Sequence, residues 1–170
     1  MPDLAPVIAA STRWLLNAYP PPAGAFSRAL AETQARQATA LAAALRYPTA
    51  IDVQLLDLLG PGGADRLDWL TGSNPAPDDD SAWRTWVDET VVSWAACLLA
   101  DPALAQRANQ VLAANEHHAD TGALRRLTNP GTRDTEAAAL LRHPDLLEPV
   151  AALHRGQLAE RLNVEGASLA

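Results

Sequence analysis

The chain has 170 residues, of which 48% are hydrophobic, and its formal net charge is −7. This length suits one domain with a sizeable core, so we expect a single domain over residues 1–170. All 13 basic residues are arginine, which excludes a Schiff-base lysine and a lysine-containing phosphate loop. The acidic balance argues against nucleic acid as a partner, because affinity for nucleic acid comes mainly from neutralised phosphate charge.

The number of cysteines and the lack of long apolar stretches indicate the cellular compartment of the protein. Cys97 is the only cysteine, which excludes a disulfide framework and a thiolate metal cluster and fits a reducing environment. Residues 1–10 lack the basic segment and apolar run of a secretory signal. No stretch approaches the roughly 20 apolar residues that cross a bilayer. We therefore expect a cytoplasmic protein with no membrane partner and no cofactor.

Alanine and leucine dominate the chain and β-branched residues are sparse, so the sequence predicts an all-α fold. Proline marks the helix ends, because it lacks an N–H and disfavours helix at the preceding residue. Pairs ending in proline recur at spacings near 14 or 28 residues, and four further boundaries fit the same step. The predicted boundaries are Tyr19, Thr33, Tyr47, Gly60, Asn74, Asp88, Asp101, Asn115, Asn129, His143 and Gln157.

Units of 13–14 residues leave room for short helices, which are marginal in isolation. Each unit must therefore pack its leucines, such as those of residues 55–59, against its neighbours. Two arrangements satisfy this requirement: a solenoid-like right-handed stack and a compact multi-helix bundle. The repeat-like region covers about residues 33–160.

Three turns share a pattern that known repeat families use. They are Arg46-Tyr47-Pro48-Thr49, Thr128-Asn129-Pro130-Gly131-Thr132 and Arg142-His143-Pro144-Asp145. These segments resemble HEAT-like repeats and, more closely, the leucine-rich repeat variant family. In those families a helix ends at an Asn-Pro, Asp-Pro or His-Pro turn, and a threonine soon afterwards can open the next helix. The resemblance implies an α-solenoid, and residues 74–89 and 115–118 depart from its pattern.

The densest group of potential metal ligands lies in residues 116–120. Adjacent histidines project about 100° apart on a helix, so His117 and His118 seldom converge on one ion without further ligands. Neither the HExxH nor the ExxH spacing is present. Two interpretations remain open: an exposed turn between helices, and a metal or partner site at His117, His118 and Asp120.

Five tryptophans accompany a single phenylalanine, and Trp83 and Trp86 have the spacing that shares one helical face. One interpretation is that they are core anchors, and the other is that they form a recognition patch. An acidic rim around tryptophans would suit a basic helix or an arginine-rich segment of a partner. The predicted partner-binding residues are Trp83, Trp86, Asp78, Asp79, Asp80, Asp88 and Glu89.

No nucleophile elbow or other catalytic pattern is visible in the sequence. We therefore expect a non-enzymatic protein–protein interaction module, a helical-repeat adaptor or scaffold, that binds a protein with a basic surface. A chaperone or immunity-type protein that binds a basic client is the first alternative. The second alternative is a metal-dependent enzyme with its site at His117, His118 and Asp120.

Overall fold

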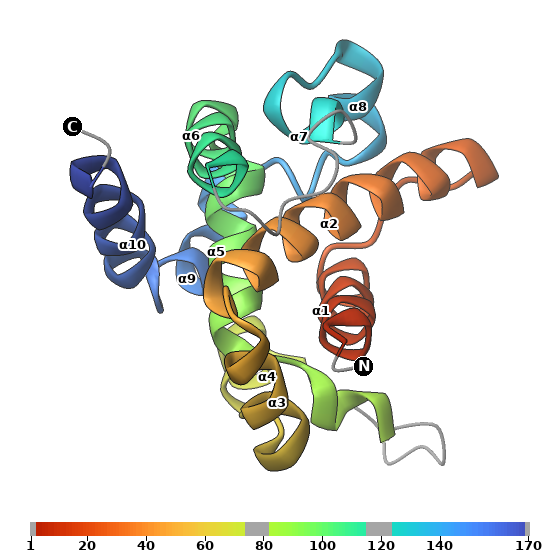
Figure 1. Cartoon of the computed structure of the whole chain (residues 1–170). Coiled ribbons are helices and arrows are strands. Elements are labelled where there is room, and N and C mark those ends of the chain that lie inside the picture. Colours follow the sequence, from red (N-terminus) through yellow and green to blue (C-terminus); the bar gives the residue numbers. More distant parts are fainter. Residues whose placement is uncertain (1–2, 74–81, 115–123, 169–170) are drawn as a thin grey trace.

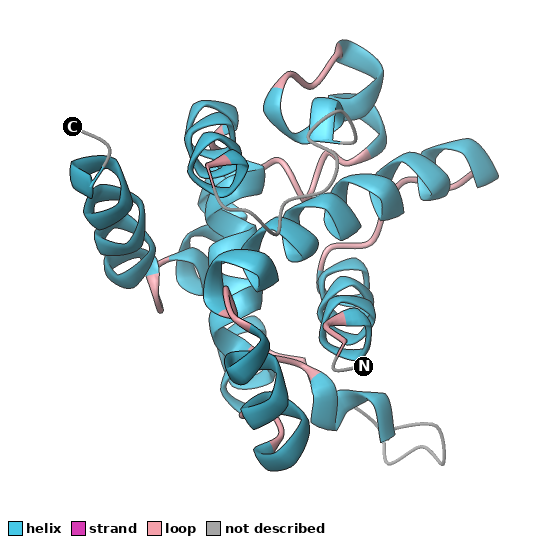
Figure 2. Cartoon of the chain, viewed as in Figure 1, coloured by secondary structure: helices cyan, strands magenta, loops and turns pink. Residues whose placement is uncertain are grey.

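The computed structural model describes residues 3–73, 82–114 and 124–168 (Figure 1). These residues form helices and no strand, which confirms the predicted all-α fold (Figure 2). The elements are α1 (Ala5–Ala18), α2 (Ala25–Arg46), α3 (Ala50–Leu59), α4 (Asp65–Thr71), the 3-10 helix η1 (Ala82–Trp86), α5 (Glu89–Ala100), α6 (Pro102–Ala113), α7 (Arg125–Thr128), α8 (Thr132–Ala137), α9 (Pro144–Ala151) and α10 (Arg155–Ser168).

Most of the predicted boundaries are helix ends. Asp88 caps α5 by accepting a hydrogen bond from the Val91 N–H, and Asp101 caps α6 in the same way. Such caps satisfy N–H groups that have no partner within the helix. The confirmed boundaries are Tyr19, Tyr47, Gly60 and Asn129 as C-caps, and Asp88, Asp101 and His143 as N-caps.

Two boundaries are wrong, because Thr33 lies inside α2 and Gln157 lies inside α10. No proline follows either residue, and the Thr33 hydroxyl donates a 2.8 Å hydrogen bond to the Ala29 carbonyl within the helix. Consequently α2 is one helix of 22 residues rather than two short units. The boundaries at Asn74 and Asn115 lie outside the described residues.

Two helices organise the core. α2 packs against α1, α5, α6, α7 and α8, and α5 also packs against α9 and α10 (Figure 1). In a linear stack each unit contacts only its neighbours, whereas α2 here contacts α8, which follows far later in the chain. The described helices thus have the packing of a multi-helix bundle around one continuous apolar core.

The sequence of α5 explains why this helix lies at the centre of the core. Residues 91–99 are all buried, and they are apolar except for Ser93. A helix that is apolar on every side is stable only when it is surrounded. The Ser93 hydroxyl is satisfied because it donates a 3.1 Å hydrogen bond to the Ala151 carbonyl of α9. None of the described helices is both long enough and apolar enough to span a membrane.

Candidate functional site

The predicted tryptophan pair lies on η1, where both side chains are partly buried and pack against the apolar core. The Trp83 ring also contacts two guanidinium groups. The Cζ atom of Arg13 is 4.5 Å from its ring centroid, and that of Arg84 is 5.4 Å away. Cation–π contacts of this kind stabilise the ring within the chain. Trp83 and Trp86 therefore present only part of their surfaces to solvent.

The acids Asp88 and Glu89 also have partners within the chain. Besides capping α5, the buried Asp88 carboxylate accepts a hydrogen bond from the Tyr47 hydroxyl. Burial, together with this hydrogen bond, raises the pKa of Tyr47. Glu89 Oε1 lies 2.7 Å from His154 Nε2 and 3.5 Å from an Arg66 nitrogen. A partner protein would have to compete with these contacts in order to bind the two carboxylates.

The remaining predicted site residues belong to two other segments of the chain. Asp78, Asp79 and Asp80, and likewise His117, His118 and Asp120, lie outside the described residues. Within the part of the chain that the structure describes, no three His, Cys, Asp or Glu side chains gather as a metal site would require.

A different surface is prominent on α3. Only Val53 and Leu56 of this helix are buried, whereas Leu58 and Leu59 are each 78% exposed, Ile51 is 68% exposed and Leu55 is 50% exposed. Of the leucines in residues 55–59, from which we expected a stripe packed on neighbouring units, only Leu56 is buried. We call Ile51, Leu55, Leu58 and Leu59 the α3 apolar face.

The α3 apolar face is contiguous along the helix. With 3.6 residues per turn, its four side chains fall within an arc of roughly 100°, and the buried pair Val53 and Leu56 lies on the other side. Leu55 and Leu59 also border a hollow of about 260 Å³, whose wall includes Arg46 and Tyr47. A helix that is apolar on two sides but covered on only one exposes a surface that monomeric proteins usually avoid.

Charges of both signs border this face, because Asp52 of α3 and Arg46 of α2 line the same hollow. α3 itself contains no basic residue. Its other acid, the exposed Asp57, lies roughly 150° around the helix from the centre of the face. The C-terminal end of a helix carries partial negative charge, and here no basic side chain of α3 offsets it. On the next helix, α4, Trp69 is 81% exposed. Cationic groups would therefore be favoured beside Asp52 and at the C-terminal end of α3.

Sequence reasoning missed this site although a signal was available. α3 has apolar residues on nearly all sides, yet it is followed by Gly60-Pro61-Gly62-Gly63, a segment that is short and has almost no side chains with which to cover a second face. No family model, no curated protein and no solved structure matches the chain. The resemblance to HEAT-like and leucine-rich repeat variant proteins therefore stays a prediction.

Proposed function

We propose that this protein is a non-enzymatic protein-binding module whose α3 apolar face docks an amphipathic helix with basic edges on a partner. The observation that carries the proposal is the exposure of Ile51, Leu55, Leu58 and Leu59 on one side of α3. Helix recognition commonly uses apolar anchors at spacings of three, four and seven residues, which these positions provide. A chaperone or immunity-type protein that covers a basic client would use the same surface.

Burial of the exposed apolar side chains would supply most of the binding free energy. Covering an exposed leucine contributes about 1.5–3 kcal/mol, so several such residues together can support a specific complex.

Charge favours a basic partner over a second copy of this chain. Two copies of this chain would each carry a net charge of −7, and like charges that meet at an interface are unfavourable. A partner helix flanked by lysine or arginine would instead meet Asp52 and the negative end of the α3 dipole. The net charge of −7 would also speed the encounter with such a partner.

A direct test measures binding of a labelled synthetic amphipathic helix made of leucine and lysine by fluorescence anisotropy. The same peptide with glutamate in place of lysine tests the role of charge. We expect the basic peptide to bind and the acidic peptide to bind at least about tenfold more weakly, in a salt-dependent manner. Equal binding of the two peptides, or binding of neither, would overturn the proposal.

Paired variants locate the binding surface. Leu58→Ser removes an anchor from the α3 apolar face and should weaken binding by about tenfold. Leu146→Ser on α9 is the matched control, because Leu146 is also exposed but lies on another helix. Sedimentation of the unliganded protein completes the test. A stable dimer that Leu58→Ser dissociates would assign the face to a second copy and refute the basic partner.

A further inference from the structure

A second surface, independent of α3, forms where α7 and α8 pack on the N-terminal half of α2. It contains a hollow of about 630 Å³, within the range of pockets that hold small organic ligands. Its lining includes Phe26 and Leu30 of α2 together with Arg125 and Arg126 of α7 and Arg133 of α8. Because it gathers three arginines in a chain of net charge −7, we call it the arginine groove.

The arginine groove carries uncompensated positive charge. Asp134 is the acid in its wall, and its carboxylate is already engaged: Oδ1 accepts a 2.8 Å hydrogen bond from Arg126, and Oδ2 accepts one of 2.9 Å from the Gly131 N–H. The side chains of Arg125 and Arg133 are exposed, and their guanidinium groups make no hydrogen bond or ion pair to the described parts of the chain. Two of the three guanidinium groups are thus available to an anion.

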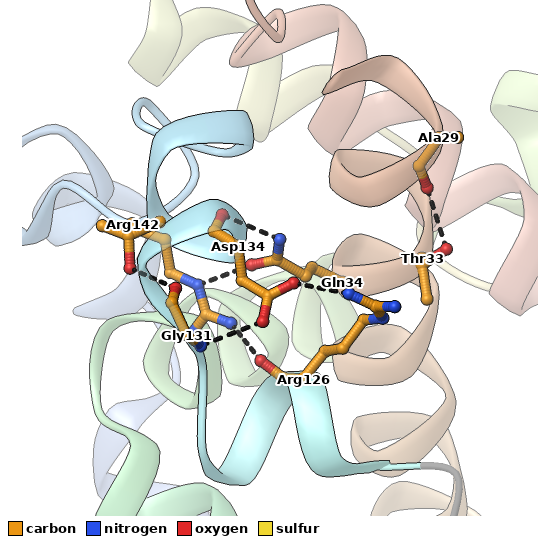
Figure 3. A network of polar contacts seen from close by, with 8 residues as sticks. Ala29, Thr33, Gln34, Arg126, Gly131, Asp134 and Arg142 are labelled. Carbon is orange, nitrogen blue, oxygen red and sulfur yellow. Dashed lines mark hydrogen bonds and ion pairs between the residues drawn. The ribbon is translucent and has the colours of Figure 1, made fainter. Parts of the chain in front are cut away.

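A partly buried polar network holds the arginine-bearing segments in place (Figure 3). Arg142 donates to Gln34 Oε1 at 2.8 Å and to the Arg126 carbonyl at 2.7 Å. Gln34, which is fully buried on α2, donates to the Asp134 carbonyl at 2.9 Å. The backbone at Arg126 and Asp134 is therefore tied to α2. Such preorganisation lowers the entropy that a ligand must overcome on binding.

The apolar part of the lining defines the rest of the ligand. Phe26 is 65% exposed although it is the only phenylalanine in the chain, and it borders the hollow beside the buried Leu30. A hollow lined by an aromatic ring and by guanidinium groups suits a ligand with an apolar or aromatic body and an anionic head. Guanidinium groups bind phosphate and carboxylate oxygens through paired hydrogen bonds.

We infer that the arginine groove binds a small organic anion, an aromatic or apolar body bearing a phosphate or carboxylate, with Arg125 and Arg133 on the anionic head and Phe26 against the body. This inference does not depend on the proposed function of α3, since the two surfaces share no residue.

The test uses phenyl phosphate, benzoate, inorganic phosphate and phenol as probes, with binding measured by NMR chemical-shift changes at low salt. We expect phenyl phosphate or benzoate to bind, inorganic phosphate to bind more weakly and phenol to show no saturable binding. The two organic anions distinguish a phosphate from a carboxylate head. No saturable shift with either organic anion, or equal affinity for inorganic phosphate, would overturn the inference.

Three variants assign the roles within the groove. Arg125→Gln and Arg133→Gln should each weaken binding of the organic anion about five- to tenfold, since each removes charged hydrogen-bond donors. Phe26→Ala should weaken the binding of the organic anions but leave the binding of inorganic phosphate unchanged. Arg28→Gln is the control, because Arg28 is exposed on roughly the opposite side of α2 from Phe26 and Leu30. An effect of Arg28→Gln as large as that of Arg133→Gln would refute the assignment, because only general charge would then matter.

Discussion

The indole nitrogen of Trp14 donates a 2.9 Å hydrogen bond to Oδ1 of Asp68, which joins α1 to α4 across 54 residues of sequence. Both residues are buried, and the other carboxylate oxygen of Asp68 accepts a hydrogen bond from Arg84 of η1. A buried carboxylate is costly unless its oxygens have partners. The three side chains thus depend on one another, and they connect α1, α4 and η1, the element that carries Trp83.

Asp68→Ala should lower the free energy of unfolding by about 2–4 kcal/mol. The substitution leaves the buried Trp14 N–H and the Arg84 guanidinium without their acceptor, and such losses cost more than the contact itself provides. Urea unfolding followed by tryptophan fluorescence measures the change. Asp65→Ala, at an exposed acid on the same helix, should cost less than about 1 kcal/mol. Equal losses in the two variants would contradict the role of Asp68.

The two tyrosines should titrate above their ordinary pKa of 10.0. Burial raises the pKa of Tyr19 and of Tyr47, and the hydrogen bond to Asp88 raises that of Tyr47 further. Since the folded state favours the neutral phenols, this contribution to stability is complete below pH 10 and declines as the pH rises above it. Spectrophotometric titration of the folded protein should show little phenolate at pH 10, whereas the chain in denaturant should titrate normally. A normal midpoint in the folded state would contradict the prediction.

Asp134→Asn should destabilise the protein at neutral pH but not in acid. Burial alone would raise the pKa of Asp134, but hydrogen bonds from the Gly131 N–H and from Arg126 lower it below its ordinary value of 3.8. The stabilisation is therefore complete above about pH 4 and is lost as the pH falls through the lower pKa of the folded state. We expect a loss of about 1–3 kcal/mol at pH 7.

Urea unfolding at pH 7 and near pH 3 checks this prediction, because the difference between Asp134→Asn and the parent should shrink in acid. Glu136→Gln, at an exposed acid of the same helix, is the control and should show little difference at either pH. A difference for Asp134→Asn that stays constant with pH would show that the carboxylate charge contributes nothing.

Cys97 should react slowly with thiol reagents while the protein is folded. Its side chain is buried on α5, and burial raises the pKa of the thiol, so little of the reactive thiolate is exposed at pH 8. Because the chain has one cysteine, labelling kinetics report on this position alone. The rate should rise toward that of the unfolded chain as urea is added. Rapid labelling without urea would contradict the burial of Cys97.

Local signals in the sequence predicted the helices better than their packing. Proline and capping residues act on the backbone next to them, so boundaries such as Tyr47, Asp88 and Asp101 are confirmed. The boundary predicted at Thr33 is wrong because a threonine hydroxyl can either cap a helix or donate a hydrogen bond to a carbonyl one turn earlier in the same helix. Thr33 does the second. The alternatives of stack and bundle could not be separated, because both bury the same apolar stripes.

The candidate sites were harder to predict, because exposure is a property of the whole fold. Trp69 and Trp83 are the same residue type in neighbouring segments, yet Trp69 is exposed and Trp83 packs against the core. Their difference depends on which helices cover them. Likewise, Leu56 and Leu58 lie two residues apart on α3 and face opposite environments.

The sequence by itself determined the all-α class and most helix ends, since helix propensity, capping and proline sterics act over a few residues. Only the tertiary structure decided which apolar side chains remain exposed on α3 and how Gln34 and Asp134 meet across 100 residues. The physical reason is that burial and long-range hydrogen bonding are set by the positions of several helices at once. The α3 apolar face and the arginine groove are both products of that packing.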